Sequence, residues 1–178
     1  MRGTRLIIII AILLVFAALA GCLFKRQPFK GVMYYGHGKV YIFHDKYYEV
    51  GQLPAGWERM KTGARTISFY NEEHKASIST DAYCGLSVSD RTLDSFSGDM
   101  TVALEDKKVT DEKEFTLDGR GALRMRVNGK VDGVPTVVDL VIVRKNYCVF
   151  DFYSVAPAGG DPDVNSAFEA FFNGFHYE

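Results

Sequence analysis

Chain reversals in the second half of the sequence constrain the fold more than any other feature. The reversal signals are Asn128-Gly129, Asp132-Gly133 and Lys145-Asn146. Each pair is typical of a tight turn between antiparallel strands. The segments that they separate are rich in β-branched, aromatic and other apolar residues, as strands usually are; they run over 122–127, 136–143 and 147–153. Three strands in series with tight turns predict an antiparallel meander.

An earlier hairpin and two helices complete the predicted fold. A strand over 65–70, a turn and a returning strand over 75–81 form the hairpin. Apolar residues recur at helical spacing over about 90–106 and again over 162–175, where Asp161-Pro162 provides a cap and a favoured first residue. The order of strands, helix, strand meander and helix predicts an α+β fold with both helices packed on an antiparallel sheet.

The N-terminal segment is set apart from this domain by its composition. Arg2 and Arg5 precede an uninterrupted apolar run, Leu6–Ala20, which small residues and Cys22 follow. This order is typical of a secretory signal. The four residues that end at Cys22 resemble the bacterial lipobox, and that resemblance implies acylation of the Cys22 thiol and cleavage before it. The alternative is an uncleaved anchor, because Leu6–Phe24 is long enough to span a bilayer.

These features divide the chain into a signal peptide over 1–21, a lipid-anchored tether over 22–36 and a single domain over 37–178. The expected location is the bacterial cell envelope, with a lipid on Cys22 in the membrane and the domain in the periplasm. Position 23 is Leu. In enteric bacteria an Asp at that position resembles an inner-membrane retention signal, so its absence favours the outer membrane.

Cysteine usage agrees with an oxidising compartment. If Cys22 carries lipid, Cys84 and Cys148 remain as an even pair in two strand-like stretches. We predict that they form a disulfide, and the alternative is two buried free thiols.

Composition and motifs exclude several functions. Lysine and arginine together number 21 against 22 acidic residues, which gives no support to nucleic-acid binding. The four histidines form no pair at metal-ligand spacing, and no nucleophile elbow or phosphate-binding loop is present. The sequence therefore predicts no catalytic residue, no metal site and no cofactor. Arg124 and Arg126 alternate on one strand face, where they could bind an anion or simply face solvent.

Tyrosines are concentrated at the start of the domain. They are Tyr34, Tyr35, Tyr41, Tyr47 and Tyr48. A tyrosine ring suits positions where one end is apolar and the other is wet, so we predict that this region contacts a partner. The alternative is a set of edge-strand tyrosines that face solvent.

The whole pattern resembles the PsbP/Mog1-like fold group over about 45–178. The resemblance depends on the Leu53-Pro54-Ala55-Gly56-Trp57 turn, the hairpin, the two helices and a phenylalanine-rich end with Asn173-Gly174-Phe175. It implies no shared chemistry, because members of this group are mostly non-catalytic assembly factors, adaptors and bacterial lipoproteins. We therefore expect a non-catalytic accessory lipoprotein that binds an envelope protein. The alternative is a carrier or sensor of a small apolar ligand or lipid.

Overall fold

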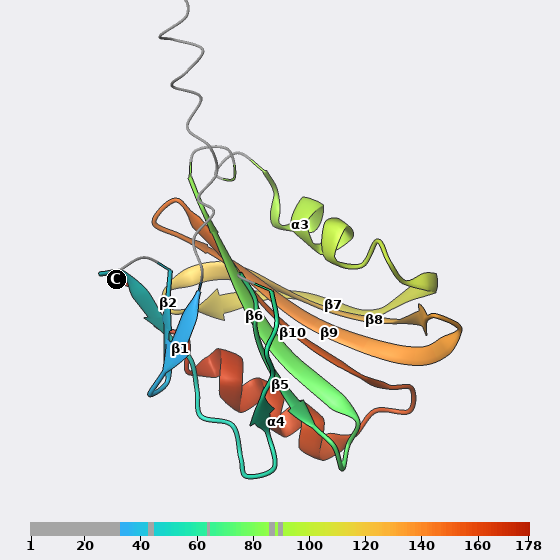
Figure 1. Ribbon diagram of the computed structural model, residues 1–178. Helices are drawn as coiled ribbons and strands as arrows, with labels where there is room; N and C mark the ends of the chain where they lie inside the picture. Colours follow the sequence, from blue (N-terminus) through green and yellow to red (C-terminus); the bar gives the residue numbers. More distant parts are fainter. Residues whose placement is uncertain (1–32, 43–44, 64, 86–87, 89–90) are drawn as a thin grey trace, which may run out of the picture.

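The computed structural model describes residues 33–42, 45–63, 65–85, 88 and 91–178. Two antiparallel sheets and two helices make up this part of the chain (Figure 1). The smaller sheet contains β1 (Tyr34–Gly36), β2 (Lys39–Tyr41) and β3 (Tyr47–Glu49). The larger sheet has seven strands in the order β4-β5-β6-β10-β9-β8-β7. Its strands are β4 (Glu58–Arg59), β5 (Ile67–Asn71), β6 (Ala76–Cys84), β7 (Glu105–Leu117), β8 (Arg120–Val131), β9 (Val134–Lys145) and β10 (Cys148–Pro157).

The predicted α+β fold is confirmed. Helices α3 (Leu93–Met100) and α4 (Pro162–Asn173) lie on opposite faces of the seven-stranded sheet (Figure 1). Alternation along each strand divides the core between these faces. Under α4 the core is aromatic and includes Phe150, Phe152, Phe168 and Phe171. Under α3 it is mostly aliphatic. No helix among the described residues is long and apolar enough to cross a bilayer.

The predicted meander is present as β8, β9 and β10, but one of the predicted reversals, Asn128-Gly129, is not a turn. Asp132 and Gly133 both have positive φ and turn the chain between β8 and β9, whereas Asn128 and Gly129 lie inside β8. A Cβ at Gly129 would lie 3.0 Å from the Glu105 carbonyl oxygen. Glycine at this position therefore lets the start of β7 approach β8, and it does not make a turn.

Helix α3 is shorter than the predicted helix over about 90–106. It begins at Leu93 after the Thr92 cap, and it ends at Met100, where the Thr101 hydroxyl donates to the Ser97 carbonyl oxygen at 3.0 Å. From Glu105 onward the chain pairs with β8 as an exposed edge strand. This strand could not be recognised from its sequence, because an edge strand outside the core needs no alternation of apolar and polar residues and this one is mostly charged.

Helix α4 is close to its predicted limits. The Asp161 side chain accepts a hydrogen bond from the Asp163 backbone N–H at 2.9 Å, and Pro162 is the first helical residue. The helix ends at Asn173, two residues before the predicted end. The folded domain also starts earlier than predicted, because Tyr34–Gly36 pairs with β2 and Met33 is buried. These residues fell in the expected tether.

Candidate functional site

The smaller sheet presents three tyrosines on one exposed face, which we call the tyrosine surface: Tyr34, Tyr41 and Tyr47. Tyr34 pairs with Tyr41, and Tyr41 pairs with Tyr47, so the three side chains lie side by side across the strands. Their ring centroids are 6.0 and 5.5 Å apart. Tyr34 is 66% exposed and Tyr47 is 37% exposed. The Lys39 ammonium lies 3.9 Å from the centre of the Tyr47 ring.

The other two tyrosines of the predicted contact set point away from this surface. Tyr48 is fully buried, its ring lies 5.0 Å from that of Phe150, and its hydroxyl is 2.9 Å from the Thr80 hydroxyl. Tyr35 packs edge-on against Phe69. The prediction was wrong for Tyr48, which is buried, since neighbouring residues of a strand face opposite sides of the sheet. For Tyr35 the contact stays a prediction.

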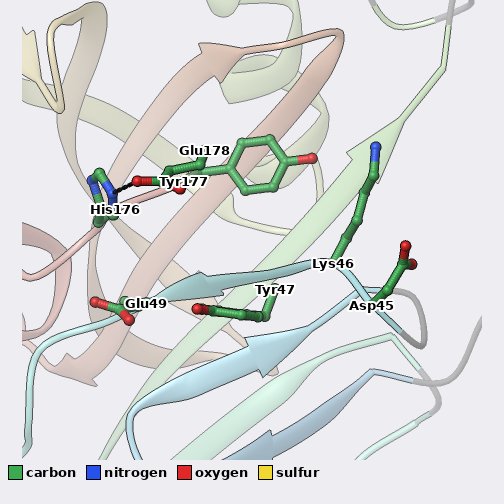
Figure 2. A pocket seen from close by; sticks show the side chains of 7 residues that line it. All are labelled: Asp45, Lys46, Tyr47, Glu49, His176, Tyr177 and Glu178. Atoms are coloured by element: carbon green, nitrogen blue, oxygen red, sulfur yellow. Dashed lines mark hydrogen bonds and ion pairs between the residues drawn. The ribbon is translucent and has the colours of Figure 1, made fainter.

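A polar hollow lies beside the tyrosine surface (Figure 2). Its volume is about 270 Å³, and it lies between β3 and the C-terminal residues. Its lining residues are Asp45, Lys46, Tyr47, Glu49, His176, Tyr177 and Glu178.

Asp118 fixes the C-terminal wall of this hollow. Its carboxylate accepts hydrogen bonds from the Tyr177 backbone N–H at 3.0 Å and from Lys145 at 2.7 Å, and it lies 3.0 Å from His176 Nδ1. Hydrogen bonding to Asp118 raises the pKa of the His176 imidazole. The hollow therefore carries both signs of charge in a defined arrangement.

A second cavity lies on the opposite side of the molecule, between α3 and the large sheet; we call it the α3 groove. Its volume is about 270 Å³. The apolar part of its wall consists of Met100, Ala103, Leu104, Val131, Val138 and Val155. The polar part consists of Asp81, Tyr83, Asp151 and Tyr153, from β6 and β10.

Asp81 and Asp151 face one another across two neighbouring strands of this groove. They are direct partners in the β6–β10 register and are 7% and 2% exposed. The Asp81 backbone N–H donates to Asp151 Oδ1 at 3.1 Å. Among the described residues, Oδ1 of Asp81 has no hydrogen-bond partner although it is buried. Like charges in direct opposition destabilise a sheet, so the state in which both carboxyl groups are ionised is disfavoured.

Burial shifts both carboxyl groups toward the protonated form. It raises the pKa of Asp81 from 3.8 to about 6, against the opposing effects of the Thr66 and Tyr153 hydroxyls and of the Arg65 charge. Burial raises the pKa of Asp151 well above its usual range, and the neighbouring Asp81 charge raises it further. Two adjacent carboxylates in a poorly solvated site cannot both be ionised readily, so the pair holds one proton near neutral pH.

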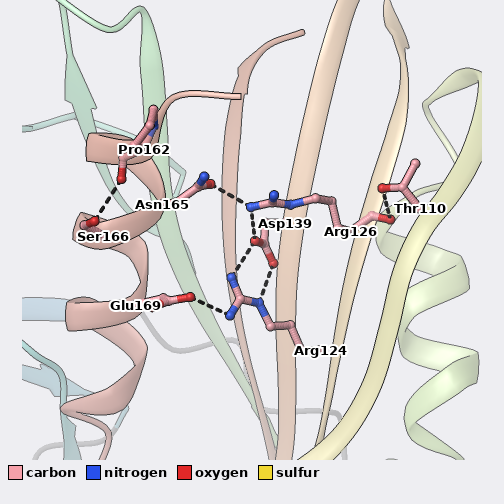
Figure 3. A network of polar contacts seen from close by, with 8 residues as sticks. All are labelled: Thr110, Arg124, Arg126, Asp139, Pro162, Asn165, Ser166 and Glu169. Carbon is pink, nitrogen blue, oxygen red and sulfur yellow. Dashed lines mark hydrogen bonds and ion pairs between the residues drawn. The ribbon is translucent and has the colours of Figure 1, made fainter. Parts of the chain in front are cut away.

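Two arginines of β8, Arg124 and Arg126, form an internal ion-pair network under α4 (Figure 3). Arg124 donates two hydrogen bonds to the buried Asp139, at 3.0 and 2.8 Å, and a third to Glu169 of α4 at 2.8 Å. Arg126 donates to Asp139 at 2.8 Å and to Asn165 at 2.7 Å. The prediction of an anion-binding or solvated face was therefore wrong. The network fixes α4 on the sheet.

The predicted disulfide is confirmed: Cys84 and Cys148 are joined and are direct partners between β6 and β10. The described residues contain no group of three or more His, Cys, Asp or Glu side chains that could hold a metal ion. Cys22 and the predicted signal peptide lie outside the described residues.

The sequence analysis did not identify the pair of Asp81 and Asp151, although the positions of the two cysteines could have revealed it. Asp81 lies three residues before Cys84, and Asp151 lies three residues after Cys148. If two cysteines are direct partners in an antiparallel register, residues at equal and opposite offsets are partners too. Combining the predicted disulfide with this rule would have placed the two carboxylates together.

Comparisons with known proteins identify the fold. No protein family and no curated protein matches the chain in sequence. A crystal structure from Bacteroides thetaiotaomicron is similar, with a TM-score of 0.56 and 12% identity over 84% of this chain and 49% of the other. This chain thus spans about half the length of that protein.

The solution structure of cyanobacterial PsbP from Synechocystis has a TM-score of 0.53 and 13% identity, over 80% of this chain and 95% of the other. The domain therefore has a PsbP-like fold. LpqN of Mycobacterium tuberculosis, which is described as involved in cell envelope biogenesis, has a TM-score of 0.46 and 16% identity, over 74% of this chain and 83% of the other.

Proposed function

We propose that this protein is a non-catalytic accessory protein of the bacterial cell envelope, held to a membrane by lipid on Cys22, which binds a protein partner through the tyrosine surface. The observation that carries this proposal is the exposed row of Tyr34, Tyr41 and Tyr47. Tyrosine is enriched at the centres of protein interfaces, where its ring supplies contact area and its hydroxyl a hydrogen bond. The hollow beside the row would accept a polar side chain of the partner.

The position of the tyrosine surface fits a partner in or near the same membrane. Tyr34 follows Cys22 by twelve residues. Even a fully extended segment of that length spans no more than about 40 Å. A lipid on Cys22 would therefore keep the tyrosine surface close to the bilayer.

Site-specific photocrosslinking in intact cells tests this proposal. A photoreactive residue replaces Tyr34 in one strain and the equally exposed Tyr147, which lies in the turn between β9 and β10, in the control strain. We expect one recurrent envelope protein to be crosslinked from position 34 and not from position 147. The affinity of the purified protein for this crosslinked partner should then fall when the three tyrosines of the surface are changed to alanine. The melting temperature of the purified protein should not change.

Two results would contradict the proposal. Crosslinks to lipid alone would mean that the tyrosine surface lies against the membrane. Equal products from both positions would mean that the surface has no specific partner. The anchor is tested separately: Cys22→Ser should release the protein from the membrane fraction, and the wild-type N-terminal peptide should carry the mass of acyl chains.

The second candidate function is a carrier or sensor of a small ligand, and the α3 groove is the observation that favours it. The groove combines a largely apolar wall with two buried carboxyl groups, as ligand pockets often combine apolar walls with a few polar groups. Native mass spectrometry of the membrane-extracted protein should find a bound small molecule. Only the bare protein mass, under conditions that retain a known ligand in a control protein, would contradict this function.

A further inference from the structure

We propose that the α3 groove binds an organic monocation with a compact apolar body, and that Asp81 is the counter-ion for its ammonium group. This inference rests on the second candidate function and names the chemical class of the ligand. It does not depend on the tyrosine surface.

The shape and lining of the groove set the size and polarity of the ligand. A volume of about 270 Å³ accommodates a molecule of roughly nine to fifteen heavy atoms and is close to the lower limit of the range found for small-molecule pockets. Aliphatic side chains from α3, β8, β9 and β10 would cover most of such a molecule. Its polar group would face the β6–β10 floor, where both carboxyl groups lie.

The charge of the ligand follows from the unpartnered oxygen. Asp81 is 7% exposed, and its Oδ1 has no hydrogen-bond partner among the described residues. Asp81 lines the groove, so an ammonium group bound there would hydrogen-bond to its carboxylate and neutralise its charge. A neutral apolar ligand would displace water from the carboxylate and increase its desolvation cost, and an anion would be repelled.

A single positive charge fits better than a divalent ion. The opposed carboxyl groups of Asp81 and Asp151 share one proton near neutral pH, so the floor presents one negative charge. The charge of Arg65 reduces that negative charge through space.

Two tyrosines flank the carboxyl groups and favour an organic cation. Tyr83 and Tyr153 both line the groove. Burial and the nearby carboxyl groups raise the pKa of both phenols, so they remain uncharged. Aromatic rings beside a carboxylate attract alkylammonium groups through the negative face of the ring, as well as through contact area.

Binding of three matched probes to the full-length protein in an uncharged detergent tests the proposal. Phenethylamine is the cation, phenethyl alcohol the neutral analogue and phenylpropionate the anion. Isothermal titration calorimetry should give an affinity for phenethylamine at least about tenfold higher than for either analogue, which is the effect of one charge-assisted hydrogen bond. The affinity should fall as the pH is lowered through about 6, where Asp81 becomes protonated.

Three variants locate the binding. Asp81→Asn should reduce the affinity for phenethylamine by about tenfold or more, whereas Asp111→Asn, a charge removed from the exposed strand β7, should leave it unchanged. Ala103→Trp should block all three probes by filling the groove.

The possible results separate the two levels of the inference. If all three probes bind equally and Asp81→Asn has no effect, the groove is a ligand site but the cation proposal is wrong. If no probe binds the wild-type protein, the cation proposal and the carrier function both fail at this groove. If phenethylamine still binds the Ala103→Trp protein with wild-type affinity, the site lies elsewhere and the proposal is overturned.

Discussion

Asp81→Asn should make the ligand-free protein more stable at neutral pH, although it removes a residue that we propose to be functional. The Asp81 carboxylate is buried opposite Asp151, and burial raises its pKa from 3.8 to about 6. At 1.36 kcal/mol for each pKa unit, the ionised form costs the fold about 3 kcal/mol relative to the protonated form. Asparagine has nearly the same shape and no charge, so the variant should recover a large part of this amount at pH 7.

The same carboxyl group should make the wild-type protein more stable in mild acid. The folded state holds the Asp81 proton more tightly than the unfolded chain, so stability is highest below pH 3.8 and decreases as the pH rises toward about 6. Between pH 7 and pH 5 the expected gain is about 1 kcal/mol. The raised pKa values of Asp151 and His176 add gains of the same sign in this range, so the wild-type profile alone does not isolate Asp81.

Urea unfolding of both proteins at pH 5, 6 and 7, followed by the fluorescence of Trp57, the single tryptophan, provides the measurement. Subtracting the profile of Asp81→Asn from that of the wild type removes the contribution of His176 and leaves that of Asp81 together with its effect on Asp151. The variant should be more stable than the wild type at pH 7, and the difference should shrink at pH 5. A variant that is less stable at pH 7, or a difference that does not change with pH, would refute the assignment of a buried, destabilising charge to Asp81.

Three further substitutions test the rest of the framework. Asp139→Asn should lower stability by about 3 to 5 kcal/mol in urea unfolding, because the buried Arg124 guanidinium loses its bidentate partner; a loss below about 1 kcal/mol would mean that this ion pair is effectively solvated. Replacing Cys84 and Cys148 by alanine, which opens a 64-residue separation, should cost about 4 kcal/mol, and a reducing agent should then affect only the wild type. Tyr48→Phe removes one buried hydroxyl hydrogen bond and should lower stability by about 1 kcal/mol in the same assay, whereas an exposed side chain would show no change.

The elements of the large sheet could be predicted where the sequence alternates or turns sharply. The β5–β6 hairpin, the meander of β8, β9 and β10, and helix α4 were all found, since each has both a periodic apolar face and a turn or cap at its end. Strand β7 was missed in part because eleven of its thirteen residues are exposed. An edge strand depends on backbone pairing with its neighbour, and that pairing leaves no pattern in its own side chains.

Residue type alone was a poor guide to which polar and aromatic groups are exposed. Tyr47 and Tyr48 have the same chemistry and adjacent positions, yet one is on the tyrosine surface and the other is in the aromatic core. Arg124 and Arg126 alternate as solvent-facing residues do, but α4 covers them. Whether a strand residue is buried or exposed depends on which helix covers its side of the sheet. The residue pattern of a single strand does not contain that information.

The acidic pair illustrates how a local pattern and a pairing rule together predict a site that neither gives alone. Asp81 and Asp151 are 70 residues apart in the chain, and each reads separately as an ordinary polar residue in a strand. The Cys84–Cys148 bond fixes the register of β6 against β10, and that register makes the two carboxyl groups direct partners. A shift of one residue in either strand would turn that strand's carboxyl group to the face under α4, away from the α3 groove. The disulfide therefore does more than stabilise the fold: it holds together the two halves of the proposed cation site, and reducing it should loosen the strand pairing on which that site depends.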